Sequence, residues 1–150
     1  MRQLTREHDI FGADTRVYIG HPLRGKGPYS DGQIQANILE ISTICRMVYA
    51  LYPGKTIISP VHMCSWLNAQ ATCDSEYALT ICKSLLDWYT NAVWMFGDWR
   101  ASEGCRMEVD YARSLDVPVR FLARREDGIY VVDKDYCCAV NEADEYGDDV

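Results

Sequence analysis

The sequence predicts a single α/β domain in which helices cover both faces of a mostly parallel sheet of about five strands. Short runs of β-branched and aromatic residues alternate along the chain with longer stretches whose apolar residues recur every three or four positions. This alternation is typical of parallel strands joined by crossover helices. The run 92–96 is apolar throughout, as expected for a strand buried on both faces. A length of 150 residues suits one domain, and the pattern favours a three-layer sandwich of the flavodoxin or Rossmann kind.

The first half of the chain holds two expected strands around one long helix. Residues 16–19 have the composition of a strand, which Gly20 ends. Residues 34–52 place apolar side chains on one helical face, and a Pro-Gly pair ends that helix. Residues 56–58 form a short second strand, and the stretch 61–75 lacks periodicity, which predicts a loop with a helical turn.

The second half repeats the alternation. Residues 76–89 form a helix with one apolar face, and the buried apolar run follows it. Ser102 is a suitable N-cap for the next helix, which continues to about Leu115. Residues 117–122 predict a fourth strand. An Asp-Gly turn then precedes a fifth strand at 129–132, whose parallel or antiparallel pairing the pattern leaves open.

Composition and charge limit the classes of partner. A net charge of −7 argues against binding to a DNA or RNA polymer, because the phosphate backbone is repelled. No apolar run approaches the ~20 residues that cross a bilayer, and the N-terminus lacks the apolar core of a signal peptide. We therefore expect a cytoplasmic protein with no membrane partner. The seven cysteines form no C-x-x-C motif and the three histidines lie far apart in the sequence, so we expect no metal site.

The same composition suggests a division of the chain. We expect an N-terminal extension over residues 1–15, the α/β domain over residues 16–135, and a tail over residues 136–150, in which acidic residues are concentrated. In an open parallel sheet, ligands bind outside the carboxyl ends of the strands. This rule selects three loops, at residues 20–32, 59–75 and 97–104, as the places to look for function.

The first of these loops offers groups that suit an anionic ligand. Gly20 directly after the first strand lets backbone N–H groups approach a ligand closely, and we also expect His21, which follows it, to contact the substrate. Arg24, next to Gly25, can donate a fork of hydrogen bonds to a phosphate. The spacing is neither that of a P-loop nor that of the dinucleotide-binding glycine motif, so the loop alone does not define a function.

The third loop leads into a helix that carries a carboxylate. Ser102 and the N–H groups after it open the helix, which is a natural place for an anion. Glu108 lies about one and a half turns further on, at the spacing Ser102-x-Gly104-x-x-x-Glu108. A helical glutamate is more often a solvated surface residue. Because this helix begins at the ligand edge, Glu108 can instead face the pocket and attack a sugar carbon.

These motifs together resemble the nucleoside 2-deoxyribosyltransferase superfamily, and within it most closely the 2'-deoxynucleoside 5'-monophosphate N-hydrolases. The resemblance spans residues 16 to 122. It is carried by the first strand with its Arg-Gly loop, the strand ending at Phe96, the Ser-x-Gly-x-x-x-Glu spacing, and Tyr111 with Ala112.

The resemblance implies a role for each matching position. Glu108 matches the nucleophile, which forms a covalent bond to the sugar, and the hydrolase branch holds the 5'-phosphate at the positions of Ser102 and Gly104. The first-loop contacts to sugar and phosphate match Gly20, Arg24 and Gly25, and Tyr18 matches an aromatic residue close to the sugar. The implied activity is hydrolysis of the base–sugar bond of a (deoxy)nucleoside 5'-monophosphate. The resemblance also implies a small-molecule substrate, a homo-oligomer and no cofactor.

One position departs from the family. Relatives carry an aspartate before the third strand that helps to protonate the base, whereas this chain has Lys83 near that position and Asn91 where many relatives also have a carboxylate. Asp98, Asp87 or His62 can take the acid role, and His62, at the end of the second strand, can also contact the base. We therefore include Asn91 and His62 among the expected substrate contacts and Asp98 with Glu108 among the catalytic residues.

Two other functions remain open from the sequence. One is base exchange between nucleosides, and the other is a protein that binds or senses a nucleotide without turnover, which the missing aspartate would permit. Among the tryptophans, Trp94 is expected in the core and Trp88 to pack within its helix, whereas Trp66 and Trp99 lie in loops where they could stack on a base or mark a subunit contact.

Overall fold

The computed structural model describes residues 12–23, 30–68, 75–128 and 130–132. Their strands form one sheet in the order β2-β1-β3-β4-β5, in which the first four are parallel and β5 is antiparallel to β4. This confirms the predicted α/β fold. The elements are β1 Arg16–Gly20, α2 Asp31–Leu51, β2 Thr56–Ile58, α3 Pro60–Met63, α4 Ser65–Asn68, α5 Ser75–Trp88, β3 Ala92–Phe96, the 3₁₀ helix η1 Trp99–Ala101, α6 Glu103–Ser114, β4 Val119–Arg124 and β5 Tyr130–Val132.

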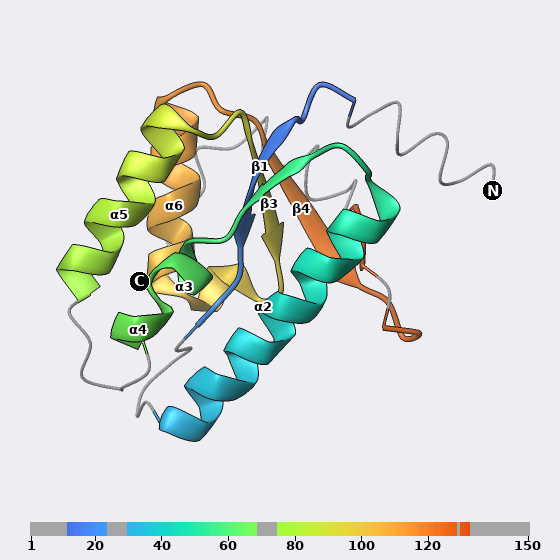
Figure 1. The fold of residues 1–150 in the computed structure, drawn as a ribbon. Coiled ribbons are helices and arrows are strands. Elements are labelled where there is room, and N and C mark those ends of the chain that lie inside the picture. The colour runs from blue at the N-terminus through green and yellow to red at the C-terminus, as the bar shows by residue number, and fades with distance from the viewer. Residues whose placement is uncertain (1–11, 24–29, 69–74, 129, 133–150) are drawn as a thin grey trace.

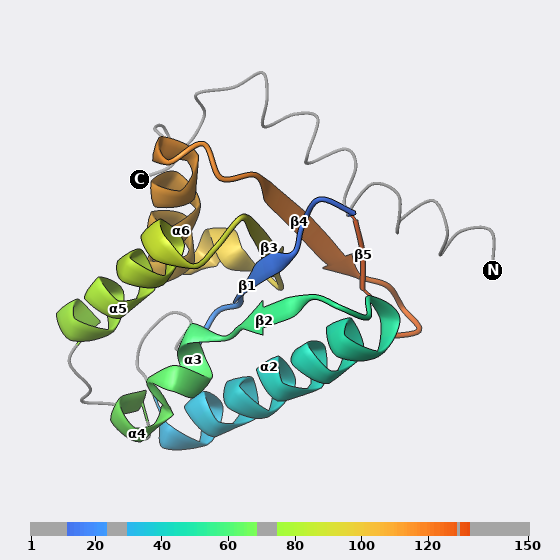
Figure 2. The ribbon, with the colours of Figure 1, turned by 45° about the horizontal axis from the view of Figure 1, so that its top comes forward.

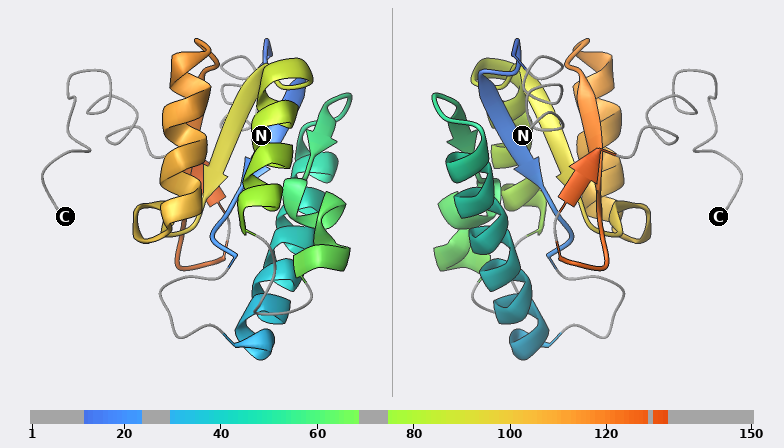
Figure 3. Two further views of the ribbon diagram at one scale, coloured as in Figure 1. Left: turned by 90° about the vertical axis from the view of Figure 1, so that its left-hand side faces the viewer. Right: turned by 90° about the vertical axis from the view of Figure 1, so that its right-hand side faces the viewer.

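The helices cover both faces of the sheet, as the sequence predicts (Figure 1). Helix α2 packs on one face through Ile44 and Val48, against β1, β3 and β4. Helices α5 and α6 pack side by side on the other face, and Figures 2 and 3 show them separated from α2 by the sheet. Strand β3 lies between β1 and β4 and is buried at all five positions. The core therefore has two halves, one on each side of β3.

The predicted elements agree closely with those observed. Helix α2 begins after Ser30, whose side chain accepts a hydrogen bond from Gln33 N, and it buries Ile34, Ile41, Ile44 and Val48. The stretch predicted as a loop with a helical turn contains two short helices, α3 and α4, because Pro60 at the first helical position starts a turn that the weak periodicity did not reveal. Among the described helices, none is both long and apolar enough to span a membrane.

Residues 12–15 pack against the amino edge of the sheet. The Asp14 side chain is 2% exposed, accepts a hydrogen bond from Trp94 Nε1 at 2.8 Å, and pairs with Arg120 at 3.2 Å. A buried carboxylate needs such partners. These residues thus belong to the domain rather than to an N-terminal extension, and the expected boundary at residue 16 is too late. The predicted acidic tail lies outside the described residues.

The burial of the four tryptophans differs in part from the prediction. Trp94 is fully buried, as expected, and meets Tyr52 edge to face at 5.0 Å. Trp88 is 80% exposed at the end of α5, so the expectation that it packs is wrong. Trp99 is 6% exposed, and its ring packs against the Phe121 ring with 4.9 Å between the two centroids. Trp99 therefore belongs to the core and does not project into a loop where a base could stack on it. Trp66 is exposed.

Candidate functional site

The Glu108 carboxylate lies at the carboxyl end of β1. Ser102 caps α6 by accepting a hydrogen bond from Cys105 N at 3.3 Å, as the sequence predicts, and the helix buries Cys105, Val109 and Ala112 against the sheet. Glu108, one turn after Cys105, points to the same side and is partly buried. Its Oε2 atom lies 3.5 Å from the place that a Cβ atom on Gly20 would occupy.

Because Gly20 has no side chain, the Glu108 carboxylate and the end of the Met95 side chain both lie close to it. A Cβ atom at residue 20 would stand 2.4 Å from Met95 Cε and 2.6 Å from Met95 Sδ. Gly20 and Met95 are also register partners in β1 and β3. A side chain at residue 20 would require the end of the buried Met95 side chain to shift, so close packing favours glycine at this position.

Tyr18 completes the inner wall of the site. Its side chain is fully buried, and its hydroxyl has no hydrogen-bond partner among the described residues. The hydroxyl lies beside the Glu108 carboxyl and favours its ionised form, but burial has the larger effect and raises the pKa of Glu108 to about 8. A carboxyl in this state holds its proton at neutral pH and becomes a nucleophile as the pH rises or as a ligand changes its surroundings.

Two thiols flank the same carboxylate. Burial raises the pKa of Cys82, on α5, to about 12, and it raises the pKa of Cys105 as well, with the negative charge of Glu108 adding to both shifts. Both thiols are therefore protonated and serve as small apolar side chains. Sequence reasoning missed Met95, Cys82 and Cys105 as parts of the site, because their proximity to Glu108 depends on strand pairing and on how α5 packs beside α6.

His21 lies at the same edge and touches the next loop. Its ring is packed against Gly97, where a Cβ atom would stand 3.2 Å from Nε2, and Gly97 has a φ of +74° that favours glycine. Nδ1 is 2.6 Å from the Pro22 oxygen, so it donates to that carbonyl. Burial lowers the pKa of the imidazole. His21 is therefore a neutral group that joins the loops after β1 and β3.

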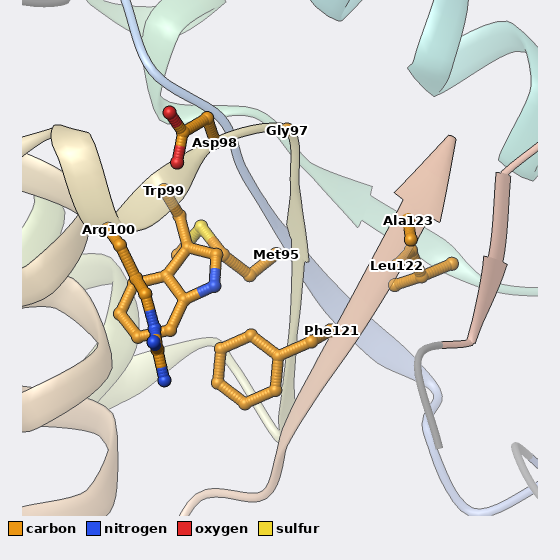
Figure 4. Close-up of a pocket in the computed structure, with 8 residues that line it drawn as sticks. All are labelled: Met95, Gly97, Asp98, Trp99, Arg100, Phe121, Leu122 and Ala123. Carbon is orange, nitrogen blue, oxygen red and sulfur yellow. The ribbon is translucent and has the colours of Figure 1, made fainter. Parts of the chain in front are cut away.

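A cavity of about 190 Å³ opens beside Met95, between the carboxyl ends of β3 and β4. Figure 4 shows the Met95, Trp99 and Phe121 side chains gathered on one side of it. Asp98 lines the cavity and is exposed. In Figure 4, Arg100 runs along the Trp99 ring, away from Asp98, with its guanidinium carbon 5.9 Å from the ring centroid. Through Met95, this cavity adjoins the place where Gly20 and Glu108 meet.

His62 lies on the other face of the sheet. Its Nε2 atom is 2.7 Å from Ser42 Oγ and its Nδ1 atom is 2.5 Å from Ser59 Oγ. It lines a groove of about 420 Å³ between α2 and β2, together with Cys45 and Ile57 among others. The structure thus places His62 on the α2 side of the sheet and Glu108 on the α6 side. The predicted contact of His62 with the base at Glu108 is not supported by this placement.

Asn91 is a structural residue at the opposite edge. It directly precedes β3, so it lies at the amino ends of the strands. Its Oδ1 accepts hydrogen bonds from Arg16 N at 2.8 Å and Thr15 N at 3.2 Å, and its Nδ2 donates to Thr15 Oγ1 at 2.9 Å and Ala13 O at 3.2 Å. The prediction that Asn91 contacts substrate is wrong, because all of its polar atoms hold the start of β1.

Lys83, which stands near the position where the deoxyribosyltransferase relatives have an aspartate, belongs to a small cluster of polar side chains. Tyr111 Oη donates to Asp87 Oδ2 at 2.7 Å, and Lys83 Nζ lies 5.4 Å from the centroid of the Tyr111 ring. Tyr111 is one turn beyond Glu108 on α6, whereas Lys83 and Asp87 are on α5. Asp87 is thus engaged with Tyr111 as a hydrogen-bond acceptor.

The remaining predicted residues fall into two groups. Gly104 is exposed in the first turn of α6, where a Cβ atom would have only Ser102 Oγ within 4 Å, at 3.9 Å. The start of this helix is therefore open to a ligand. Arg24 and Gly25 lie outside the described residues. Among the described residues, no group of three or more His, Cys, Asp or Glu side chains is placed to hold a metal ion.

Comparison with known proteins gives one match. A family model described as "Domain of unknown function (DUF4406)" matches residues 16–121. No curated protein and no solved structure matches the chain significantly. The matched segment runs from the first residue of β1 into β4, and it includes Tyr18, Gly20, Ser102 and Glu108. Because the match covers well over half of the sequence, the chain belongs to the DUF4406 family.

Proposed function

We propose that this protein hydrolyses the base–sugar bond of a (deoxy)nucleoside 5'-monophosphate, with Glu108 as the nucleophile. The observation that carries the proposal is the place of the Glu108 carboxylate, beside Gly20 and the unpartnered Tyr18 hydroxyl at the carboxyl edge of the sheet. A ligand is expected at this edge in a parallel α/β fold. The resemblance of the Ser-x-Gly-x-x-x-Glu spacing to the deoxynucleotide N-hydrolases supports the same reaction.

The surroundings of Glu108 suit attack on a sugar carbon. Tyr18 Oη can donate a hydrogen bond to the carboxylate, which orients it and favours its ionised form. Gly20 has no side chain that would stand between the carboxylate and a sugar. The 5'-phosphate would lie at the start of α6, near Ser102 and Gly104, where backbone N–H groups and the helix dipole favour an anion.

The reaction has two steps in this proposal. A Glu108 oxygen attacks C1' while the bond from C1' to the base nitrogen breaks, through a transition state with oxocarbenium character, and the base nitrogen keeps the electron pair and takes up a proton. A water molecule then attacks C1', the bond to Glu108 breaks, and the free sugar phosphate leaves as the water gives up a proton, which balances the proton taken up by the base. The proposal names no cofactor in either step. We further propose that the protein acts as a homo-oligomer in the cytoplasm.

The test is to incubate the protein with a panel of nucleosides and their 5'-monophosphates and to detect free base by chromatography. We expect base release from at least one monophosphate, and slower release from the nucleoside that lacks the phosphate. Adding a second free base and looking for a new nucleoside distinguishes hydrolysis from base exchange. If a nucleotide binds tightly and no base is released over hours, the proposed reaction is wrong and the protein is a nucleotide binder.

A further inference from the structure

A histidine and two serines form a hydrogen-bonded chain on the α2 side of the sheet, away from Glu108. Ser59 is the first residue after β2, so it lies at the carboxyl edge of the sheet, and Ser42 is on α2. His62, on α3, lies between them, with Nδ1 2.5 Å from Ser59 Oγ and Nε2 2.7 Å from Ser42 Oγ. Each ring nitrogen therefore has a hydroxyl partner from a different segment of the chain.

The direction of these hydrogen bonds follows from Ser42. Its hydroxyl donates to the Ile38 carbonyl at 3.0 Å. Because a hydroxyl has one proton, Ser42 Oγ accepts the hydrogen bond from His62 Nε2. In a neutral imidazole the second nitrogen then carries no proton, so Nδ1 accepts a hydrogen bond from the Ser59 hydroxyl. The Ser59 proton thus points at a base that Ser42 holds in place.

The Ser59 hydroxyl bonds to the histidine instead of capping its helix. Ser59 is the N-cap of α3, a position at which a serine side chain usually accepts a hydrogen bond from the first turn, but it makes no such bond here. A hydroxyl, a base within hydrogen-bond reach and a third group that orients the base make up the arrangement of an activated nucleophile. The contacts give Ser59 the features of a nucleophile and His62 those of its base.

The same three side chains line the groove of about 420 Å³ between α2 and β2, which has the size of a small-molecule site. Its other lining residues are Cys45, Arg46, Tyr49 and Ile57, which offer mostly apolar surface. Burial raises the pKa of the Cys45 thiol, although Ser59 opposes this shift, so the thiol keeps its proton and is the weaker nucleophile. The groove therefore suits a short apolar acyl group whose carbonyl lies beside Ser59.

We propose that Ser59 is the nucleophile of a second site that hydrolyses esters of small apolar carboxylic acids, with His62 as general base and Ser42 as a positioning residue. Ser59 Oγ attacks the ester carbonyl carbon while its proton passes to His62 Nδ1. The bond to the ester oxygen breaks, and the leaving alcohol takes this proton. Water then attacks the acyl carbon and gives a proton to Nδ1, and Ser59 regains the proton as its acyl bond breaks. The sum is ester plus water, giving acid and alcohol.

The experiment follows the hydrolysis of p-nitrophenyl butyrate by the full chain and locates the covalent acyl group by mass spectrometry after an acid quench. We expect turnover above the rate in buffer and a butyryl group on the peptide that contains Ser59. Ser59→Ala and His62→Gln should each be slower by about 10²-fold or more, whereas Ser84→Ala should match the wild type. Ser84 is the matched control because it makes the same kind of hydrogen bond as Ser42, to the Thr80 carbonyl at 3.0 Å, but lies on α5.

A second arm tests the positioning role of Ser42. Ser42→Ala should slow ester hydrolysis by about tenfold or more, whereas Ser42→Thr, which keeps the hydroxyl, should restore the rate. Turnover by Ser59→Ala at the wild-type rate, an acyl group found on Cys45 instead of Ser59, or no turnover by the wild type would each overturn the proposal. Base release from nucleotides is measured separately, so that either activity can fail without the other.

Discussion

At the scale of single residues, the proposed chemistry depends on a carboxyl group that the fold places in apolar surroundings. Glu108 lies among Tyr18, Met95 and two protonated thiols, so its charged form is less stable than in water. The Tyr18 hydroxyl partly offsets this by favouring the carboxylate. The same burial that removes water from the proposed nucleophile would also set the pH at which it works.

The first prediction concerns that pH dependence. The pKa of Glu108 is raised from 4.5 to about 8, so the nucleophilic carboxylate becomes the major form only above that pH. The value of kcat/KM for base release should therefore increase with pH, reach half of its maximum near pH 8 in the free protein, and level off only above that pH. A profile that is already flat between pH 5 and 7 would contradict the assignment of Glu108 as a buried nucleophile.

The second prediction concerns Gly20. In Gly20→Ala the new methyl group would meet the buried Met95 side chain at 2.4 Å and lie 3.5 Å from Glu108 Oε2. We expect the free energy of unfolding to fall by about 1–3 kcal/mol, as for an overpacked core, and base release to fall more than this loss of stability explains. The control is Gly32→Ala in α2, where no atom lies within 4 Å of the added carbon. Thermal unfolding and base release measured on both variants provide the test, and equal activity of the two would contradict it.

At the scale of elements, the sequence predicts most helices and strands because their signals are local. The Ser102 cap, the spacing to Glu108 and the apolar run 92–96 are all read from neighbouring residues. Pairing across the sheet is not local. The register that brings Gly20 beside Met95, and the side to which Tyr18 points, follow from how β1 and β3 align.

Asn91 shows where the resemblance misled the prediction. Its position directly before β3 places it at the amino edge, which the rule for ligand sites in parallel sheets already excludes. The family pattern suggested a substrate contact there instead. His62 differs in that it does follow β2, at the correct edge, but the sequence could not reveal that its ring bonds to Ser42 on α2.

The third prediction follows from the role of Asn91. Asn91→Ala removes four hydrogen bonds that join the residue before β3 to residues 13–16. We expect the free energy of unfolding to fall by about 0.5–1.5 kcal/mol, while the Kd for nucleotide and the rate of base release in the folded protein stay the same. Denaturant unfolding and isothermal calorimetry measure the two quantities, with Gln35→Ala on the exposed side of α2 as the control. A variant of full stability with weakened binding would instead place Asn91 in the site.

At the scale of the whole molecule, the buried carboxyl makes stability depend on pH. Between pH 4.5 and about 8 the folded chain keeps a proton on Glu108 that the unfolded chain has lost. Stability should therefore decrease as the pH rises through this window, by about 1.4 kcal/mol per pH unit from this group. Below the window both states hold the proton, and above it neither does.

The fourth prediction uses this linkage. Glu108→Gln keeps the size of the side chain but cannot ionise, so its stability should lack this decrease between pH 4.5 and 8, and at pH 8 the variant should be more stable than the wild type. Glu103→Gln, at an exposed position in the first turn of the same helix, is the matched control. Denaturant unfolding at several pH values compares the three proteins. Parallel curves for the wild type and Glu108→Gln would show that the carboxyl is not buried as described.

The central claim is that Glu108 breaks the base–sugar bond, and the most direct measurement is base release by the wild type, Glu108→Gln and Asp110→Asn from the same nucleotide at pH 8, with Asp110 at an exposed position further along α6 as the control. The prediction is that Asp110→Asn matches the wild type and that Glu108→Gln, folded and still able to bind the nucleotide, is slower by about 10³-fold or more. If Glu108→Gln releases base at the rate of the wild type, Glu108 is not the nucleophile.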